Sequence, residues 1–191
     1  MKRLLFITIL LLQTIIYAQK PCEFDSDFTD SLGSYKETKT KIMYERIFGN
    51  SSSYIIFSLA KTNGIPLLKF QSIQKSKDFI KVNCFDKSSR IYLELANGKI
   101  ITMIISDEGD CGTMLRDEAQ TSNIRITSAS FLFMKNTMEE LQKSPLQRVR
   151  IRYSSTEIVD YMIKETLLSE MNKQTYEPEK FFIENIPCIN Q

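Results

Sequence analysis

The chain has 191 residues, and its 25 Lys and Arg nearly balance its 23 Asp and Glu, so it lacks the net positive charge expected of a nucleic-acid-binding protein. It contains no histidine, which excludes Ser-His-Asp and Cys-His catalysis, HExxH zinc sites and the commonest general base. This length and 42% hydrophobic content predict one domain with one core, which we place at residues 19–191.

Residues 1–18 have the pattern of an export signal. A positive start (Lys2, Arg3) precedes an apolar run from Leu4 to Ile16, and Ala18 offers a small residue for cleavage. The run contains polar residues and is shorter than the ~20 residues of a spanning helix, so a permanent anchor is the weaker interpretation. We expect an exported protein, periplasmic or secreted, whose processed chain has 23 basic and 23 acidic residues.

The first half of the processed chain predicts strands. Residues 35–48 are rich in Thr and Lys and suit an exposed or edge strand. Two apolar segments, 53–60 and 65–73, flank the turn signal Thr62-Asn63-Gly64, and residues 78–85 suggest the next strand. Together these segments predict an antiparallel meander.

The clearest local signal is a hairpin over Ile91–Ile105. Asn97-Gly98 separates two β-rich runs, and this dipeptide accepts the positive φ angles of a two-residue type I′ turn. Leu95 and Ile100 should therefore lie on neighbouring strands.

A strand over 123–133 and a short helix should follow. The Thr137-x-x-Glu140 spacing is that of a capping box, which predicts a helix from Met138 to about Lys143. Ser144-Pro145 should end this helix.

In residues 147–153, QRVRIRY, apolar and charged side chains alternate, which predicts a strand with one solvent-exposed face. Its inward positions are Val149, Ile151 and Tyr153, and its outward positions are Arg148, Arg150 and Arg152. A row of guanidinium groups could bind the phosphate, sulfate or carboxylate of an anionic ligand. The alternative is a solubilising face paired with Asp or Glu on a neighbouring strand.

Residues 154–173 fit either a helix or a return strand. Ser154-x-x-Glu157 could cap a helix, whereas Val159, Tyr161 and Ile163 alternate as in a strand. A terminal helix should begin near Pro178. Its apolar face would carry Phe181, Phe182, Asn185 and Ile186, and Pro187 should stop it just before Cys188.

Four cysteines in an exported chain favour disulfides over free thiols. Three connectivities are possible. We favour Cys22 with Cys188, which ties the ends of the processed chain together and leaves Cys84 with Cys111.

From Cys22 onward the layout resembles a group of small exported bacterial proteins of unknown function. The matching segments are CEFDSDFTD at 22–30, TMEELQKSPLQRVRIRY at 137–153 and FFIENIPCI at 181–189. The resemblance implies an α+β fold, mainly an antiparallel β-sheet meander with a short internal helix and a C-terminal helix. It also implies a return strand at 157–165, and it carries no catalytic residues.

Acidic clusters supply weaker candidates. Asp107-Glu108-Gly109-Asp110 and the group Asp25, Asp27 and Asp30 each resemble part of a calcium loop without its full ligand spacing. A carboxylate pair for glycoside hydrolysis could come from Glu94, Asp107, Glu108 or Glu157, and the sequence selects no pair among them.

These observations predict a non-catalytic exported binding or envelope-associated structural module that needs no metal or cofactor. Its partner would be an anionic glycan, a lipid headgroup or another envelope protein. The alternative is a carboxylate-dependent hydrolase acting on envelope glycans.

Overall fold

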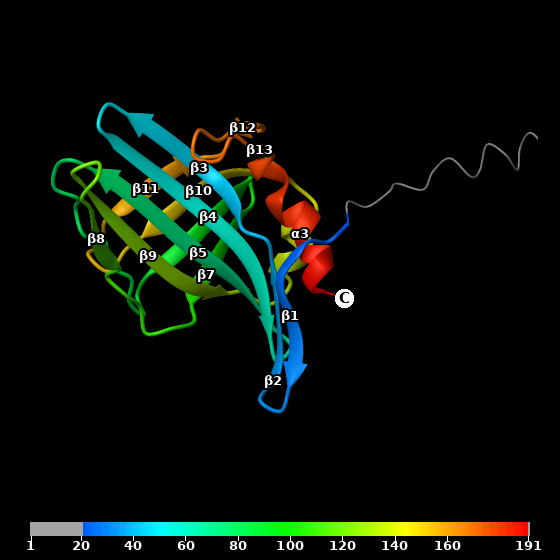
Figure 1. Ribbon diagram of the computed structural model, residues 1–191. Helices are drawn as coiled ribbons and strands as arrows, with labels where there is room; N and C mark the ends of the chain where they lie inside the picture. Colours follow the sequence, from blue (N-terminus) through cyan, green and yellow to red (C-terminus); the bar gives the residue numbers. More distant parts are fainter. Residues whose placement is uncertain (1–20, 191) are drawn as a thin grey trace, which may run out of the picture.

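One large antiparallel sheet carries most of the chain (Figure 1). The computed structural model describes residues 21–190, so the expected export signal, residues 1–18, lies outside the described residues. Its strands are β1 Phe24–Asp30, β2 Gly33–Thr38, β3 Lys41–Phe48, β4 Ser51–Thr62, β5 Ile65–Ser76, β6 Arg90–Leu95, β7 Ile100–Ile105, β8 Thr113–Asp117, β9 Ser122–Leu132, β10 Leu146–Arg152 and β11 Ile158–Met162. The remaining elements are the two-stranded pair β12 Leu167–Leu168 and β13 Thr175–Tyr176, the helix α2 Thr137–Leu141, the 3₁₀ turn η1 Pro178–Lys180 and the helix α3 Phe181–Ile189. The fold is α+β, as the sequence predicts.

The main path through the sheet runs β1-β2-β4-β5-β9-β7-β6-β10-β11. β2 and β3 both pair with β4, at opposite ends of that strand, so the segment predicted as one strand over 35–48 is two strands with a break between them. β7 and β8 share β9 in the same way. The sheet therefore divides beyond β9, and β6, β7, β10 and β11 form a separate wing.

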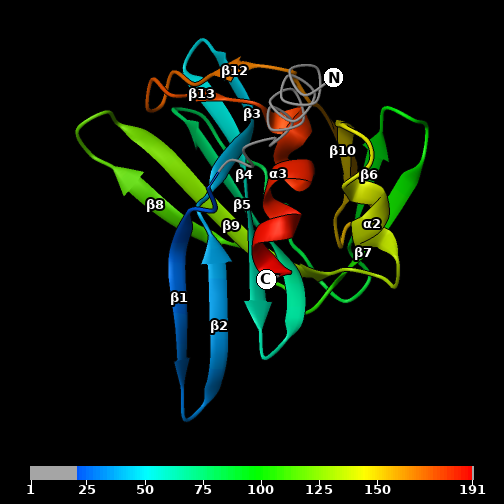
Figure 2. The ribbon, with the colours of Figure 1, turned by 90° about the vertical axis from the view of Figure 1, so that its right-hand side faces the viewer.

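The helix α3 lies between the two wings of the curved sheet (Figure 2). It contacts β2 and β4 on one side and α2 on the other. Phe181, Phe182 and Ile186 are buried in the same cluster as the sheet residues Phe57 and Phe131, and the Phe57 and Phe181 ring centroids are 5.7 Å apart. Helix and both wings thus share one core.

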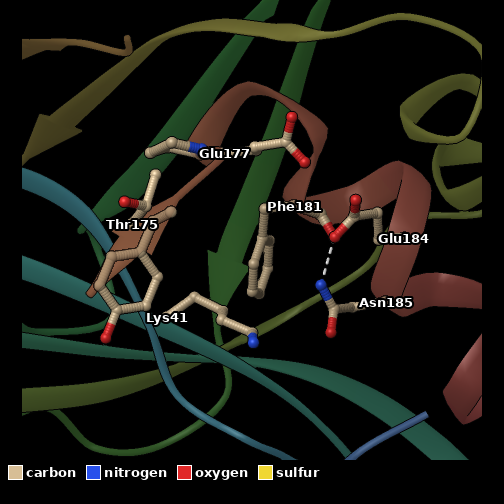
Figure 3. A pocket seen from close by; sticks show the side chains of 8 residues that line it. Lys41, Thr175, Glu177, Phe181, Glu184 and Asn185 are labelled. Atoms are coloured by element: carbon tan, nitrogen blue, oxygen red, sulfur yellow. Dashed lines mark hydrogen bonds between the residues drawn. The ribbon is translucent and has the colours of Figure 1, made fainter. Parts of the chain in front are cut away.

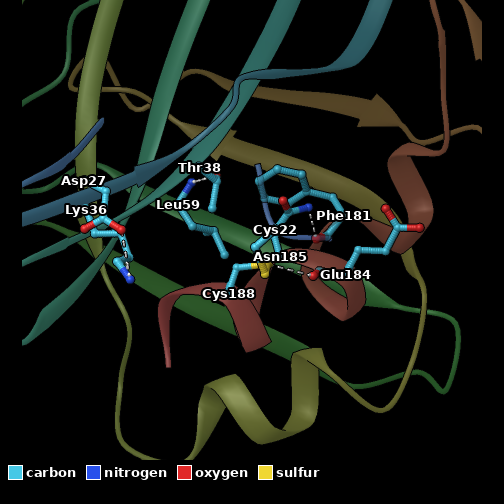
Figure 4. The surroundings of a disulfide bond; sticks show 9 residues. All are labelled: Cys22, Asp27, Lys36, Thr38, Leu59, Phe181, Glu184, Asn185 and Cys188. Atoms are coloured by element: carbon cyan, nitrogen blue, oxygen red, sulfur yellow. Dashed lines mark hydrogen bonds and ion pairs between the residues drawn. A yellow bond between two sulfur atoms is a disulfide. The ribbon is translucent and has the colours of Figure 1, made fainter. Parts of the chain in front are cut away.

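Two disulfides link segments at the edge of the core. Cys22, just before β1, is bonded to Cys188 of α3 (Figure 4), and Cys84 is bonded to Cys111. Both pairings are the ones favoured from the sequence. The first fixes the terminal helix to the start of the sheet, and the second joins the 77–89 and 106–112 loops. No helix within residues 21–190 is long and apolar enough to span a membrane.

The predicted hairpin is present, but its turn type is different. β6 and β7 pair and Gly98 has φ +81°, whereas Asn97 is not among the residues with positive φ. The Gly98 N–H donates to the Leu95 carbonyl and the Leu95 N–H to the Lys99 carbonyl, which is a type I turn followed by a glycine bulge. The type I′ turn that we expected here occurs instead at Asn63 and Gly64, with φ 50° and 83°.

The strand predicted over 78–85 is wrong. Ile80 and Phe85 are buried while Phe79 and Val82 are exposed, so burial does not alternate and no strand pairs with the segment. The backbone is held by the bond from Phe85 N–H to the Asp110 carbonyl, beside the Cys84–Cys111 disulfide. The segment is a loop that closes one end of the core.

Two helix-end predictions are also wrong. The helix α2 begins at Thr137, and its N-cap residue is Asn136 and not Thr137. The cap makes no side-chain bond, and the Thr137 hydroxyl donates to the Met134 carbonyl. Pro187 does not stop α3, which continues to Ile189 although proline removes one backbone donor. Burial of Ile186 and Ile189 and the disulfide at Cys188 hold that last turn in place.

The ambiguous segment after β10 is a strand. β11 runs antiparallel to β10, and the Tyr153 N–H donates to the Glu157 carbonyl across a turn that contains Thr156 at φ 63°. The helix considered for 154–173 is absent, and the return strand implied by the resemblance is present.

Candidate functional site

Arg148, Arg150 and Arg152 lie together on the outer face of β10. Val149 and Ile151 between them are fully buried, because successive side chains of a strand point to opposite faces. On one side their register partners on β6 are Glu94, Tyr92 and Arg90, and on the other side their partners on β11 are Met162, Asp160 and Ile158. We call these nine residues the arginine face.

Two of the three predicted arginines are balanced by carboxylates. Arg150 holds Asp160 through two bonds, Nε to Oδ1 at 2.6 Å and Nη2 to Oδ2 at 2.8 Å. Arg148 bonds Glu94 and also lies 3.5 Å from Asp160. The hydrogen bond from Arg150 lowers the pKa of the Asp160 carboxyl and raises that of the guanidinium. Arg148 and Arg150 thus have the Asp and Glu partners on neighbouring strands that the alternative interpretation expects.

Arg152 has a different environment. Its register partner on β6 is Arg90, so two like charges lie directly opposite each other. Within residues 21–190, neither guanidinium has a carboxylate oxygen within 4 Å. Like charges opposed across strands destabilise a sheet, by about 0.2–1 kcal/mol if they mirror the gain from opposite charges. The cross-strand pair Arg90 and Arg152 therefore presents two positive charges that no carboxylate of the described residues neutralises.

A rigid turn positions both cations. Arg90 Nη1 donates to the carbonyls of Lys87 at 2.8 Å and Ser89 at 2.7 Å, and Arg152 Nη2 donates to that of Ser88 at 2.5 Å. The Asp86 carboxylate accepts bonds from the Ser88 hydroxyl and amide, which lower its pKa and fix the turn. A guanidinium has five N–H donors, so several on each arginine remain for a ligand.

The arginine face is hollowed beside this row. A depression of about 290 Å³ is lined by Tyr92, Glu94, Ile100, Arg148, Arg150, Arg152 and Ile158. Ile100 and Ile158 are more than half exposed at its edges. The site thus combines guanidinium donors with apolar walls, which suits an anionic group attached to a larger, partly apolar molecule.

Three of the four acidic residues considered for hydrolysis, Glu94, Glu157 and Asp107, have structural partners. Glu94 pairs with Arg148, and Glu157 pairs with Lys81. Asp107 accepts from the backbone N–H of Gly109 and of Ser130, which holds its loop against β9. The depression beside the arginine face is lined by Glu94 alone of the four.

Neither acidic cluster forms a cation cage in the described chain. Among residues 21–190, no three Cys, Asp or Glu side chains converge as metal ligands. Asp27 pairs with Lys36, and the Asp30 carboxylate caps the turn at Leu32.

A second hollow, of about 210 Å³, lies between β3 and α3 (Figure 3). Lys41, Phe181, Glu184 and Asn185 line it together with Glu177, which bonds Lys180 at 2.9 Å. Its charges include both signs, so it is a weaker candidate for an anion than the arginine face. The sequence analysis did not identify this hollow.

Arg90 is the arginine of the arginine face that the sequence analysis missed. The alternation of β6 shows that it points outward, but only the pairing of β6 with β10 brings it opposite Arg152.

Comparisons of the chain with protein-family models, with curated proteins and with solved structures find no match.

Proposed function

We propose that this protein is an exported, non-catalytic binding module that captures an anionic group on the arginine face. The observation that carries the proposal is the opposed pair Arg90 and Arg152. Among the described residues this pair has no carboxylate partner, although the neighbouring arginines Arg148 and Arg150 do. A sheet under no functional demand would gain stability from an acidic residue at one of these positions.

The chemistry of the pair favours a phosphate, sulfate or carboxylate. Guanidinium groups bind such oxyanions through two parallel N–H donors, and the bonds are charge-assisted. The exposed Ile158 beside Arg152 and the Tyr92 ring offer apolar contact to the remainder of the ligand. An anionic glycan and a lipid headgroup share this chemistry.

Export is supported by the residue pattern at 1–18 and by the two disulfides, which persist in oxidising compartments. The resemblance to small exported bacterial proteins supports a periplasmic or secreted location. There the anionic groups of glycans and lipids would be accessible to the arginine face.

Calorimetric titration with inorganic pyrophosphate tests the proposal. We expect wild-type protein to bind, and Arg152→Gln to bind about tenfold more weakly, because one charge-assisted contact is removed. Arg116→Gln is the matched control, since Arg116 on β8 is exposed, bonds only Asn123 and lies outside the arginine face. Equal affinity of both variants would contradict the proposal.

The same variants separate the two ligand sources. Binding of sulfated dextran oligosaccharides, lost in Arg152→Gln, would identify a glycan. Binding of phosphatidylglycerol vesicles, lost in the same variant, would identify a lipid headgroup.

A further inference from the structure

A polar row crosses the inner face of the sheet at the end that is remote from α3. Arg46 of β3, Ser53 of β4, Gln74 of β5 and Arg125 of β9 are consecutive register partners on four neighbouring strands. Four residues further along β4 and β5, the same face carries the core residues Phe57 and Phe70. The inner face therefore changes from apolar to polar towards this end.

A groove of about 440 Å³ lies over this row, and Arg46, Ser53 and Gln74 are among its lining residues. Phe48 at the end of β3 and Phe79 of the 77–89 loop also line it, and they are 73% and 83% exposed. Exposure of two phenyl rings at one groove loses hydrophobic stabilisation that burial would provide. The rings thus offer apolar surface to a ligand in the groove.

The polar groups of the row are available for hydrogen bonding. Within the described chain, the side chains of Ser53 and Gln74 have no hydrogen-bond partner, and Arg46 has no ion pair, with its guanidinium 5.9 Å from the Phe48 ring. Arg125 is 92% buried and donates from Nη1 to the Cys111 carbonyl, while its Nε has no partner. Arg125 does not line the groove, but it is the register partner of the lining residue Gln74 and adds a buried positive charge to the same row.

The two lysines that line the groove already have carboxylate partners. Lys75 pairs with Asp117 at 2.8 Å, and Lys81 pairs with Glu157. Asp78 is the acidic residue among those that line the groove, and it lies on the same loop as Phe79. Of the cations that line the groove, Arg46 has no carboxylate partner within residues 21–190, so its guanidinium remains for the carboxylate of a ligand.

We propose that this groove binds a sugar residue that carries a carboxylate. The hydroxyl of Ser53 and the amide of Gln74 match the alternating donors and acceptors of sugar hydroxyls. Phe48 and Phe79 match the apolar face of a pyranose ring, and Arg46 matches the carboxylate. The proposal does not depend on the arginine face, which lies on the outer surface of the other wing.

Titration of the purified protein with a galacturonate trimer tests the inference, with maltotriose as the uncharged control. We expect wild-type protein to bind the galacturonate trimer at least about tenfold more tightly than maltotriose, since the two ligands differ in their carboxylates. Equal affinity for the two, or no binding of either, would overturn the proposal.

Three variants locate the site. Phe79→Ser and Arg46→Gln should each weaken galacturonate binding about tenfold, and Arg46→Gln should also reduce the preference over maltotriose. Leu32→Ser is the matched control, because Leu32 is 89% exposed in the β1–β2 turn and does not line the groove. If Phe79→Ser disturbs folding, Gln74→Met tests the groove without loss of an aromatic ring, and this variant should also weaken galacturonate binding.

Arg152→Gln distinguishes the groove from the arginine face. Galacturonate binding should be unchanged in this variant. Loss of binding in Arg152→Gln with retention in Arg46→Gln would place the sugar on the arginine face and refute the groove.

Discussion

Removal of the Cys22–Cys188 disulfide is the perturbation whose magnitude follows most directly from the structure. The bond joins residues 166 positions apart, whereas Cys84–Cys111 joins residues 27 apart. Loop-closure entropy of the unfolded chain then predicts stabilisation of about 5 kcal/mol for the first bond and about 3.5 kcal/mol for the second. For a domain of this size these values correspond to losses in Tm of roughly 10–20 °C and 7–14 °C.

Paired alanine variants measure the two contributions without leaving a free thiol. Urea denaturation followed by circular dichroism should place Cys22→Ala/Cys188→Ala below Cys84→Ala/Cys111→Ala in unfolding free energy, with wild type above both. An equal or reversed order of the two variants would refute the argument from loop length.

Three further predictions concern the turn, the buried tyrosines and the arginine face. Gly98→Val should lower the unfolding free energy by about 1–3 kcal/mol, because valine is strained at φ +81° although its Cβ meets no atom within 4 Å; an unchanged melting curve would refute the strain. Burial raises the pKa of Tyr153 and Tyr161 above the ordinary 10.0, so their contribution to stability is present below pH 10 and is lost as the pH rises. Spectrophotometric titration should show these two tyrosines ionising only when the protein unfolds. Ionisation of all tyrosines before unfolding would contradict this prediction. Arg150→Gln should raise the pKa of Asp160 towards 3.8 in an NMR titration. A depressed carboxyl pKa stabilises the fold at pH values above the ordinary pKa, so the variant should lose less stability on acidification. An unchanged Asp160 pKa would contradict the bidentate pair.

The strands that the sequence predicted correctly are those with one buried face and a local turn. The alternation of Val149 and Ile151 with three arginines defines β10, and glycines at positions 64 and 98 mark the two hairpins. The exact turn at Gly98 was not predictable, because the Ala96 and Asn97 N–H groups bond to Pro145 and Ser144, which are distant in sequence. Local preference was overridden by tertiary contacts.

The loop over 78–85 was not predictable for a related reason. Its composition suits a strand, but the chain lacks a neighbouring strand at that position, and a disulfide at Cys84 fixes the backbone instead. Pro187 is a similar case, since burial of Ile186 and Ile189 maintains a helix that proline alone would end.

The candidate site was predictable only in part. The sequence identifies the outward row on β10, but the distinction between neutralised and available arginines depends on which strands flank it. Asp160 and Glu94 neutralise two positions, and Arg90 leaves the third available. Such long-range pairing has no local signature in one sequence.

An arginine Nε–Hε correlation spectrum during titration with inorganic pyrophosphate tests the central claim most directly. The account predicts that the Arg90 and Arg152 cross-peaks shift first and saturably, while Arg116 on β8 does not move. Shifts confined to arginines outside the arginine face, or no saturable shift at all, would contradict it.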